Sequence, residues 1–168
     1  RYDVLGSTNV APSGYGSAAS SGRKGNDATS TCATSPVANT LMAALPSALR
    51  AVMKPMTIYT DNTAGGSDTA SYVTKSVDYL PLLAEFEIFG SRSYANSAEK
   101  NYQKQYDYYK AGNSKIKYRH NSTSSAASWW ERSPYYNYSN AFCLVYTSGD
   151  AYPIDARLSY GLAPAFRV

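Results

Sequence analysis

Five residue types are missing from the C-terminal end of this chain. The last 36 residues, 133–168, contain no Lys, Glu, Gln, Met or Trp, although they are rich in Tyr, Asn, Ser, Asp and Ala. The preceding 132 residues contain 8 Lys, 4 Glu, 2 Gln, 3 Met and 2 Trp. At that density about five would be expected in the last 36 residues. Either a separate constraint acts on the C-terminal segment, or the depletion is a chance property of a strand-rich tail.

Catalytic and metal-binding residue types are scarce in the whole chain. His120 is the single His, and it lies in a basic run without a neighbouring acid, which fits a surface residue better than a catalytic triad. No phosphate-binding glycine loop and no Asp-rich calcium loop occurs. Cys32 and Cys143 fit no metal-ligand spacing; they can pair, but two buried free thiols are favoured. The sequence therefore predicts no enzyme, no cofactor and no metal site.

Glu85 and Glu87 are the nearest approach to a pair of catalytic carboxylates. They would point to opposite sides of a strand and nearly opposite sides of a helix. We instead expect a short helix in which Glu85 faces solvent and Phe86 faces the core.

Charge and hydropathy argue against two further classes of protein, those that bind nucleic acid and those that span a membrane. The net charge is +4, and the densest basic run, 115–120 (KIKYRH), fits a solvated edge strand as well as a nucleic-acid contact. We expect no nucleic-acid partner. No apolar run reaches ~18 residues, so no membrane span is expected. No signal peptide is visible, and a start at Arg1 without Met predicts a fragment or a processed product.

The order of the expected elements indicates an α+β fold in one domain. Residues 1–34 read as an N-terminal strand and loop segment of the same domain, and residues 35–168 as the folded part. A helix is expected to begin at Ser35-Pro36, with a kink or restart at Pro46, and residues 56–60 read as a strand. Helices come mainly first, whereas antiparallel strands and long loops come last.

Residues 97–112 give the clearest helix pattern. Ser97 is the expected N-cap, and Gly112 the expected end. Tyr102, Tyr106 and Tyr109 fall at i, i+4 and i+7 and so share one face. We interpret that face as a core-facing stripe rather than a binding patch.

The motif WWERSP at 129–134, followed by GLAPAF at 161–166, resembles the C-type-lectin-fold variable proteins of diversity-generating retroelements. The likeness is greatest to a branch of unknown function in gut phages and Bacillota, and it extends over 35–168 through VDYLPLLAEFEIFG and QYDYYKAGNSKIKY. In that family a reverse transcriptase miscopies template adenines, so that Asn codons change into a residue set that excludes Lys, Glu, Gln, Met and Trp. The resemblance therefore implies a hypervariable cassette at 133–168.

The resemblance also implies a division of the cassette into an invariant frame and a variable, exposed face. We assign large apolar and turn-forming residues to the frame: Trp129, Trp130, Phe142, Val145, Gly149, Gly161, Pro164 and Phe166. Tyr135 and Tyr136 can belong to either set. The expected ligand-binding residues are Tyr138, Asn140, Ala141, Leu144, Tyr146, Thr147, Asp150, Tyr152, Pro153, Ile154, Asp155, Arg157, Leu158 and Tyr160.

By this resemblance the chain is expected to be a hypervariable ligand-binding module, namely the host-receptor-binding protein of a phage, located on the virion. A display or adhesion protein on a bacterial surface is the alternative, and a glycan-processing enzyme is a third interpretation. The calcium and sugar motifs of true C-type lectins are absent, so the fold does not imply sugar binding. The receptor can be a protein or a glycan, and assembly of several copies through sequence upstream of Arg1 is left open.

Overall fold

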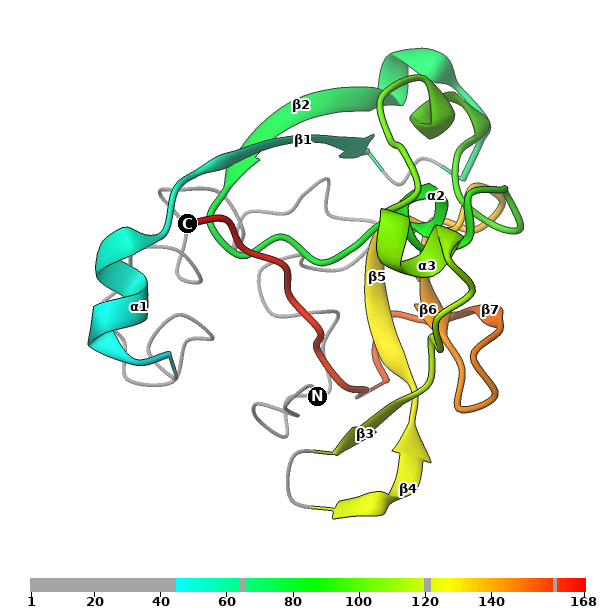
Figure 1. The fold of residues 1–168 in the computed structure, drawn as a ribbon. Coiled ribbons are helices and arrows are strands. Elements are labelled where there is room, and N and C mark those ends of the chain that lie inside the picture. Colours follow the sequence, from blue (N-terminus) through cyan, green and yellow to red (C-terminus); the bar gives the residue numbers. More distant parts are fainter. Residues whose placement is uncertain (1–44, 64–65, 120–121, 159) are drawn as a thin grey trace.

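The computed structural model describes residues 45–63, 66–119, 122–158 and 160–168 (Figure 1). The expected segment 1–34, the helix start at Ser35-Pro36 and Cys32 lie outside these residues. The elements in chain order are α1 (Ser47–Val52), β1 (Met56–Asp61), the 3-10 helix η3 (Ala70–Tyr72), β2 (Val73–Asp78), α2 (Glu85–Phe89), the 3-10 helix η4 (Ser97–Asn101), α3 (Asp107–Lys110), β3 (Lys117–Arg119), β4 (Ser122–Ala127), β5 (Trp129–Pro134), β6 (Ala141–Val145) and β7 (Ala151–Asp155).

The expected α+β class is confirmed. Short helices accompany three small antiparallel sheets, with strand orders β1-β2, β3-β4 and β5-β6-β7 (Figure 1). The strand expected at 56–60 is present as β1, and α1 begins directly after Pro46. The basic run contributes β3, which pairs with β4 alone among the described strands, as expected for an edge strand.

The β5-β6-β7 sheet carries the core on both of its faces. Neighbouring side chains of a strand point to opposite faces, so the adjacent residues Trp129 and Trp130 enter different clusters. Trp130 packs with Phe142 and Leu144. Trp129 packs with hydrophobic residues of α2 and α3 and with Val145. Both indoles are buried, which places β5 between the two clusters of the hydrophobic core.

An irregularity in β5 turns polar side chains into this core. The pairing of β5 with β6 shifts between Trp130 and Pro134. Within that interval the Arg132 amide donates to the Leu83 carbonyl at 2.9 Å instead of to β6. Bulges of this kind redirect side chains, and here they bury three consecutive polar residues, Glu131, Arg132 and Ser133.

The prediction of a single helix at 97–112 is wrong. The segment forms η4 and α3, separated by residues 102–106. Tertiary hydrogen bonds interrupt the helix: the Tyr106 amide donates to the Glu87 carbonyl at 2.9 Å, and the buried Gln103 side chain donates to the Tyr59 carbonyl at 2.9 Å. The N-cap is Asn96 rather than Ser97, because the Asn96 side chain accepts from the Ala98 amide at 3.0 Å.

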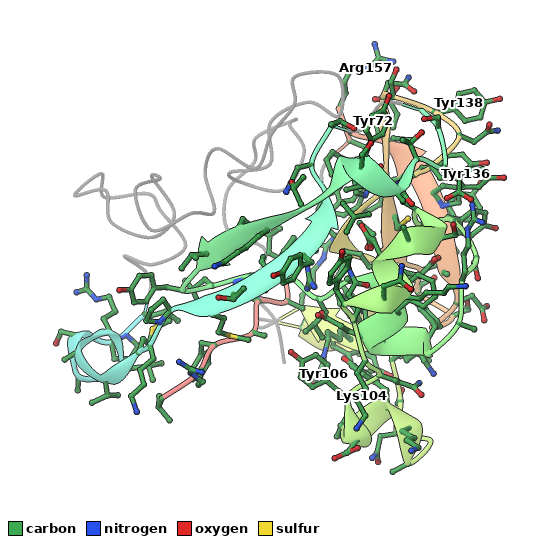
Figure 2. All side chains as sticks on the ribbon, turned by 90° about the horizontal axis from the view of Figure 1, so that it is seen from above. Tyr72, Lys104, Tyr106, Tyr136, Tyr138 and Arg157 are labelled. Atoms are coloured by element: carbon green, nitrogen blue, oxygen red, sulfur yellow. The ribbon has the colours of Figure 1, made fainter. Side chains whose placement is uncertain are left out.

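The prediction that Tyr102, Tyr106 and Tyr109 form a core-facing stripe is wrong for two of these three residues. Tyr109 is buried, but Tyr102 is 55% and Tyr106 is 40% exposed. The break between η4 and α3 removes the helical spacing that would have aligned them. Figure 2 shows Tyr106 at the surface beside Lys104.

Two further expectations about burial are wrong. The short helix α2 exists, but Glu85 is completely buried rather than solvent-facing, because its carboxylate accepts hydrogen bonds from the loop that follows the helix. Phe166 was assigned to the frame as a large apolar residue, yet it is 46% exposed and lies outside the strands.

Candidate functional site

Seven of the fourteen predicted binding residues are exposed and five are half-buried, but two are buried. Ala141 is 7% and Leu144 is 1% exposed, which corrects the expectation that both lie on the surface. The reason is their place in β6, which lies between β5 and β7 and contacts a core cluster on each face. The remaining twelve residues lie in the β5-β6 loop, in the β6-β7 loop, in β7 and in the segment after β7.

A first group of predicted residues gathers at one end of the β6-β7 hairpin. The β5-β6 connection supplies Tyr138 and Asn140, the end of β7 supplies Asp155, and the turn after it supplies Arg157 and Leu158. The two segments are joined because the Ala156 amide donates to the Asn140 carbonyl at 2.9 Å. Figure 2 shows Tyr138 and Arg157 on the same side of the molecule. This group is the loop face.

An exposed ion pair lies within the loop face. Arg157 contacts Asp155 at 2.8 Å, and its guanidinium hydrogen bonds lower the pKa of the Asp155 carboxyl. The Arg157 side chain is 86% exposed, so the pair is screened by water and stabilises the fold little. Both charges remain accessible to a ligand.

Tyrosine rings beside the loop face form a connected cluster. The Tyr135 ring contacts the rings of Tyr94, Tyr136 and Tyr138, with centroids 5.6, 5.5 and 5.5 Å away. The Arg92 guanidinium lies 4.1 Å from the centroid of the Tyr136 ring. Sequence reasoning missed Tyr94 and Arg92 because they precede the cassette and lie in a loop without periodicity. The structure thus adds two supporting residues from outside 133–168.

A second group lies at the opposite end of the hairpin, where β6 turns into β7. Tyr146 and Tyr152 bring their ring centroids to 5.7 Å, and each side chain is 47% exposed. The turn between them closes through the Tyr146 amide and the Asp150 carbonyl at 2.7 Å, with Gly149 at φ 94°. That positive φ suits glycine, which supports the assignment of Gly149 to the frame.

The second group borders a pocket of about 310 Å³. Tyr146, Thr147 and Tyr160 form one part of its wall, and Arg119 and Ser128 form another. Arg119 belongs to the basic run that the sequence analysis noted without assigning it to the site. Aromatic rings, hydroxyl groups and one cation therefore converge here, which is a composition typical of ligand pockets. The second group and this pocket are together the pocket face.

The edge strand β7 connects the loop face to the pocket face. Among the described strands β7 pairs with β6 alone, and it carries the half-buried Pro153 and Ile154. Five strand residues span roughly 17 Å, so the two faces lie about that far apart. The predicted site is thus an elongated surface rather than a single concave centre.

Beneath this surface lies a buried polar centre that sequence reasoning did not find. The Arg132 guanidinium donates to both carboxylate oxygens of Glu87, to the Thr60 hydroxyl at 2.8 Å and to the Leu82 carbonyl at 2.8 Å. Arg132 is 1% exposed, so these bonds replace its lost hydration. The sequence feature that could have revealed this centre is the Arg of the RSP motif, because an Arg that becomes buried needs a hydrogen-bonding or acidic partner.

Glu99 extends the buried polar centre toward β1. Its carboxylate accepts from the Asp61 amide at 2.8 Å, the Ser133 hydroxyl at 2.7 Å and the Gln103 side chain at 2.8 Å. Burial raises the pKa of Glu99 to about 6, although these hydrogen bonds and Arg132 oppose the shift. The network links η4, β1 and β5, and it fixes the frame that carries both faces.

The architecture defines an α+β domain whose exposed C-terminal loops surround a buried central strand. The sequence model of the family described as "Domain of unknown function (DUF6273)" matches residues 37–168, so the chain belongs to this family. No curated protein and no solved structure matches the chain. No helix in the described parts of the chain combines the length and apolarity that a membrane crossing requires.

Proposed function

We propose that this chain is a hypervariable ligand-binding module with a C-type-lectin-like fold, diversified by a retroelement. The observation that carries the proposal is the division of 133–168 into buried and exposed residues. The β6 residues are buried, whereas tyrosines in the adjoining loops and β7 are about half exposed. This same segment lacks the five residue types that adenine miscopying of Asn codons cannot produce.

The exposed residues suit binding in their chemistry. Tyr138, Tyr146 and Tyr152 offer large contact areas with a hydroxyl and few rotatable bonds, so ordering them costs little entropy. Aromatic and Arg side chains supply most of the binding energy at protein interfaces. A rigid frame below them allows the side chains to change without loss of the fold. Binding without a chemical step is therefore the proposed activity.

The proposed role is host recognition by a phage, with the module exposed on the virion and a host cell-surface receptor as partner. A bacterial display or adhesion protein would use the same surface, and the genes beside the coding sequence separate these two. Phage tail genes together with a reverse transcriptase support the phage role, and cell-envelope genes support the alternative. A glycan-processing enzyme would instead release products from host glycans when the purified chain is added.

The decisive experiment is to sequence the source DNA for a second, near-identical copy of the region that encodes 133–168. The proposal expects such a template copy, with adenines at the positions where the coding copy differs. It also expects populations of the coding copy to vary at exposed positions of the loop face and the pocket face. A coding region with no template copy, and with changes spread evenly over 45–168, would contradict diversification by a retroelement.

A further inference from the structure

A cluster of three potential metal ligands lies inside the frame. Glu85 begins α2, Glu131 lies in β5 and Cys143 lies in β6. Each is 0% exposed, and one carboxylate oxygen from each Glu lies with the Cys143 sulfur so that all three are within 4.8 Å of one another. These residues are 46 and 12 positions apart along the chain, so no sequence spacing could have revealed the cluster.

Glu131 is the residue that calls for an explanation. Both of its carboxylate oxygens are buried, and neither has a hydrogen-bond partner among the described residues. A buried carboxylate without a partner is strongly unfavourable, and such a group in a native fold indicates a missing ion, water or proton. By contrast, Glu85 accepts from the amides of Ser93, Tyr94 and Ala95 at 2.8 to 3.0 Å.

The charges around Glu131 favour the binding of a cation, rather than an anion, beside its carboxylate. Glu131 experiences repulsion from Glu85, Glu99 and Glu87, and Arg132 is the cation that opposes it. The guanidinium of Arg132 is already engaged with Glu87. A divalent cation between Glu85, Glu131 and Cys143 would offset this excess of negative charge.

We propose that Glu85, Glu131 and Cys143 form a structural site for a divalent metal ion of the Zn²⁺ type. Zn²⁺ accepts thiolate and carboxylate ligands together, whereas Ca²⁺ and Mg²⁺ take oxygen ligands only. Three protein ligands leave one position of a tetrahedral site for an enclosed water. Tetrahedral zinc places its ligand atoms roughly 3.5 Å apart, a distance that small side-chain rotations can reach from the observed one.

Metal binding at this site would release the proton of the Cys143 thiol. That thiol now donates to the Pro134 carbonyl, with sulfur and oxygen 3.7 Å apart, and the metal would take its place as the partner of the sulfur. The site differs from the calcium site that the sequence excludes, because its donor set includes sulfur. It would fasten α2 to β5 and β6, and through Glu85 it would hold the loop that carries Tyr94 beside the loop face.

The test is the metal content of the purified chain, produced with Zn²⁺ in the medium and measured by mass spectrometry of the metals. We expect about one zinc ion per folded chain. Glu131→Gln and Cys143→Ser should contain almost none and should no longer gain melting temperature from added Zn²⁺. Glu99→Gln is the matched control, because it neutralises another buried carboxylate and keeps all three ligands; it should retain the zinc.

Replacement of the metal by Co²⁺ gives a readout that does not depend on variants. A thiolate-to-cobalt charge-transfer band in the wild-type chain would support the site even if both ligand variants fail to fold. A folded wild-type chain that contains no zinc and shows no such band would overturn the proposal. So would a Glu131→Gln variant that melts as high as the wild type, because a shared proton or an enclosed water would then satisfy Glu131.

Discussion

Arg132 and Glu87 form a two-pronged ion pair inside the protein, with both terminal nitrogens of the guanidinium facing the two carboxylate oxygens. The side chains are 2% and 11% exposed. The pair joins β5 to α2, and β5 leads directly into the loop that carries Tyr138. It therefore couples the position of the proposed binding surface to the helical layer.

Removing one member of this pair should be costly. Arg132→Met leaves the Glu87 carboxylate buried without its cation, and we expect a loss of about 3–5 kcal/mol in the free energy of unfolding. Arg132→Lys keeps the charge but cannot make the forked contact, so its loss should be intermediate. Urea denaturation measures both. The double variant Arg132→Met with Glu87→Gln should lose less than the sum of the single losses, and strict additivity would show that the pair is not coupled.

The two tryptophans at the start of β5 should be essential for stability. Trp129 and Trp130 are 0% and 1% exposed and fill different clusters. Truncation of either to Ala should cost about 3–5 kcal/mol through lost burial and a cavity. Because a domain of this size has only about 5–15 kcal/mol of stability, at least one variant should unfold or melt much earlier. Thermal melts followed by circular dichroism check this, and two variants that melt like the wild type would contradict the frame assignment.

The tyrosines of the pocket face should behave in the opposite way. Tyr146→Ala and Tyr152→Ala should change the free energy of unfolding by within ~0.5 kcal/mol. At least one should weaken binding to the recognised cell by about thirtyfold, equivalent to ~2 kcal/mol. Tyr108→Ala is the matched control, since Tyr108 is 57% exposed but lies on α3 outside the cassette. A cell-binding assay beside a thermal melt separates the effects, and equal binding by all three variants would count against this face.

Natural variation should follow exposure within the cassette. Tyr138, Tyr146 and Tyr152 should vary between copies from one population. Ala141 and Leu144 should stay apolar because β6 is buried on both faces, where polar or larger side chains cost several kcal/mol. Deep sequencing of the coding region tests the contrast. Polar replacements at position 144 as frequent as at position 152 would show that burial does not limit the variation.

The raised pKa of Glu99 predicts how the free energy of unfolding depends on pH. Its pKa in the folded chain, about 6, lies above the ordinary value of 4.5 because burial disfavours the carboxylate. Between these pH values the folded state binds this proton more tightly than the unfolded chain does. The contribution of Glu99 to the free energy of unfolding therefore falls as pH rises through that window, by about 2 kcal/mol in total.

The measurement is urea denaturation of the wild type and of Glu99→Gln at pH 4.5 and pH 7. The wild type should lose stability relative to the variant as the pH rises. A difference between the two proteins that stays constant, or that changes in the opposite direction, would show that the folded state does not raise the pKa of Glu99.

The sequence alone indicated the α+β class, the strand at 56–60, a helix beginning after Pro46, the edge strand in the basic run and the burial of the two tryptophans. Each of these depends on local pattern or on side-chain size, which a short stretch of sequence contains. The composition change at 133–168 also pointed to the segment whose loops are exposed.

Only the tertiary structure decided where polar groups meet. The Arg132–Glu87 pair, the contacts of Glu99 with Asp61 and Ser133, and the cluster around Glu131 join residues that are 12 or more positions apart, and sequence carries no periodic signal for such contacts. The helix expected at 97–112 failed for the same reason: the hydrogen bonds that Gln103 and Tyr106 donate to distant backbone carbonyls outweigh local helix propensity. Ala141 and Leu144 were misplaced because exposure in a strand depends on its neighbours, and β6 has a strand on each side.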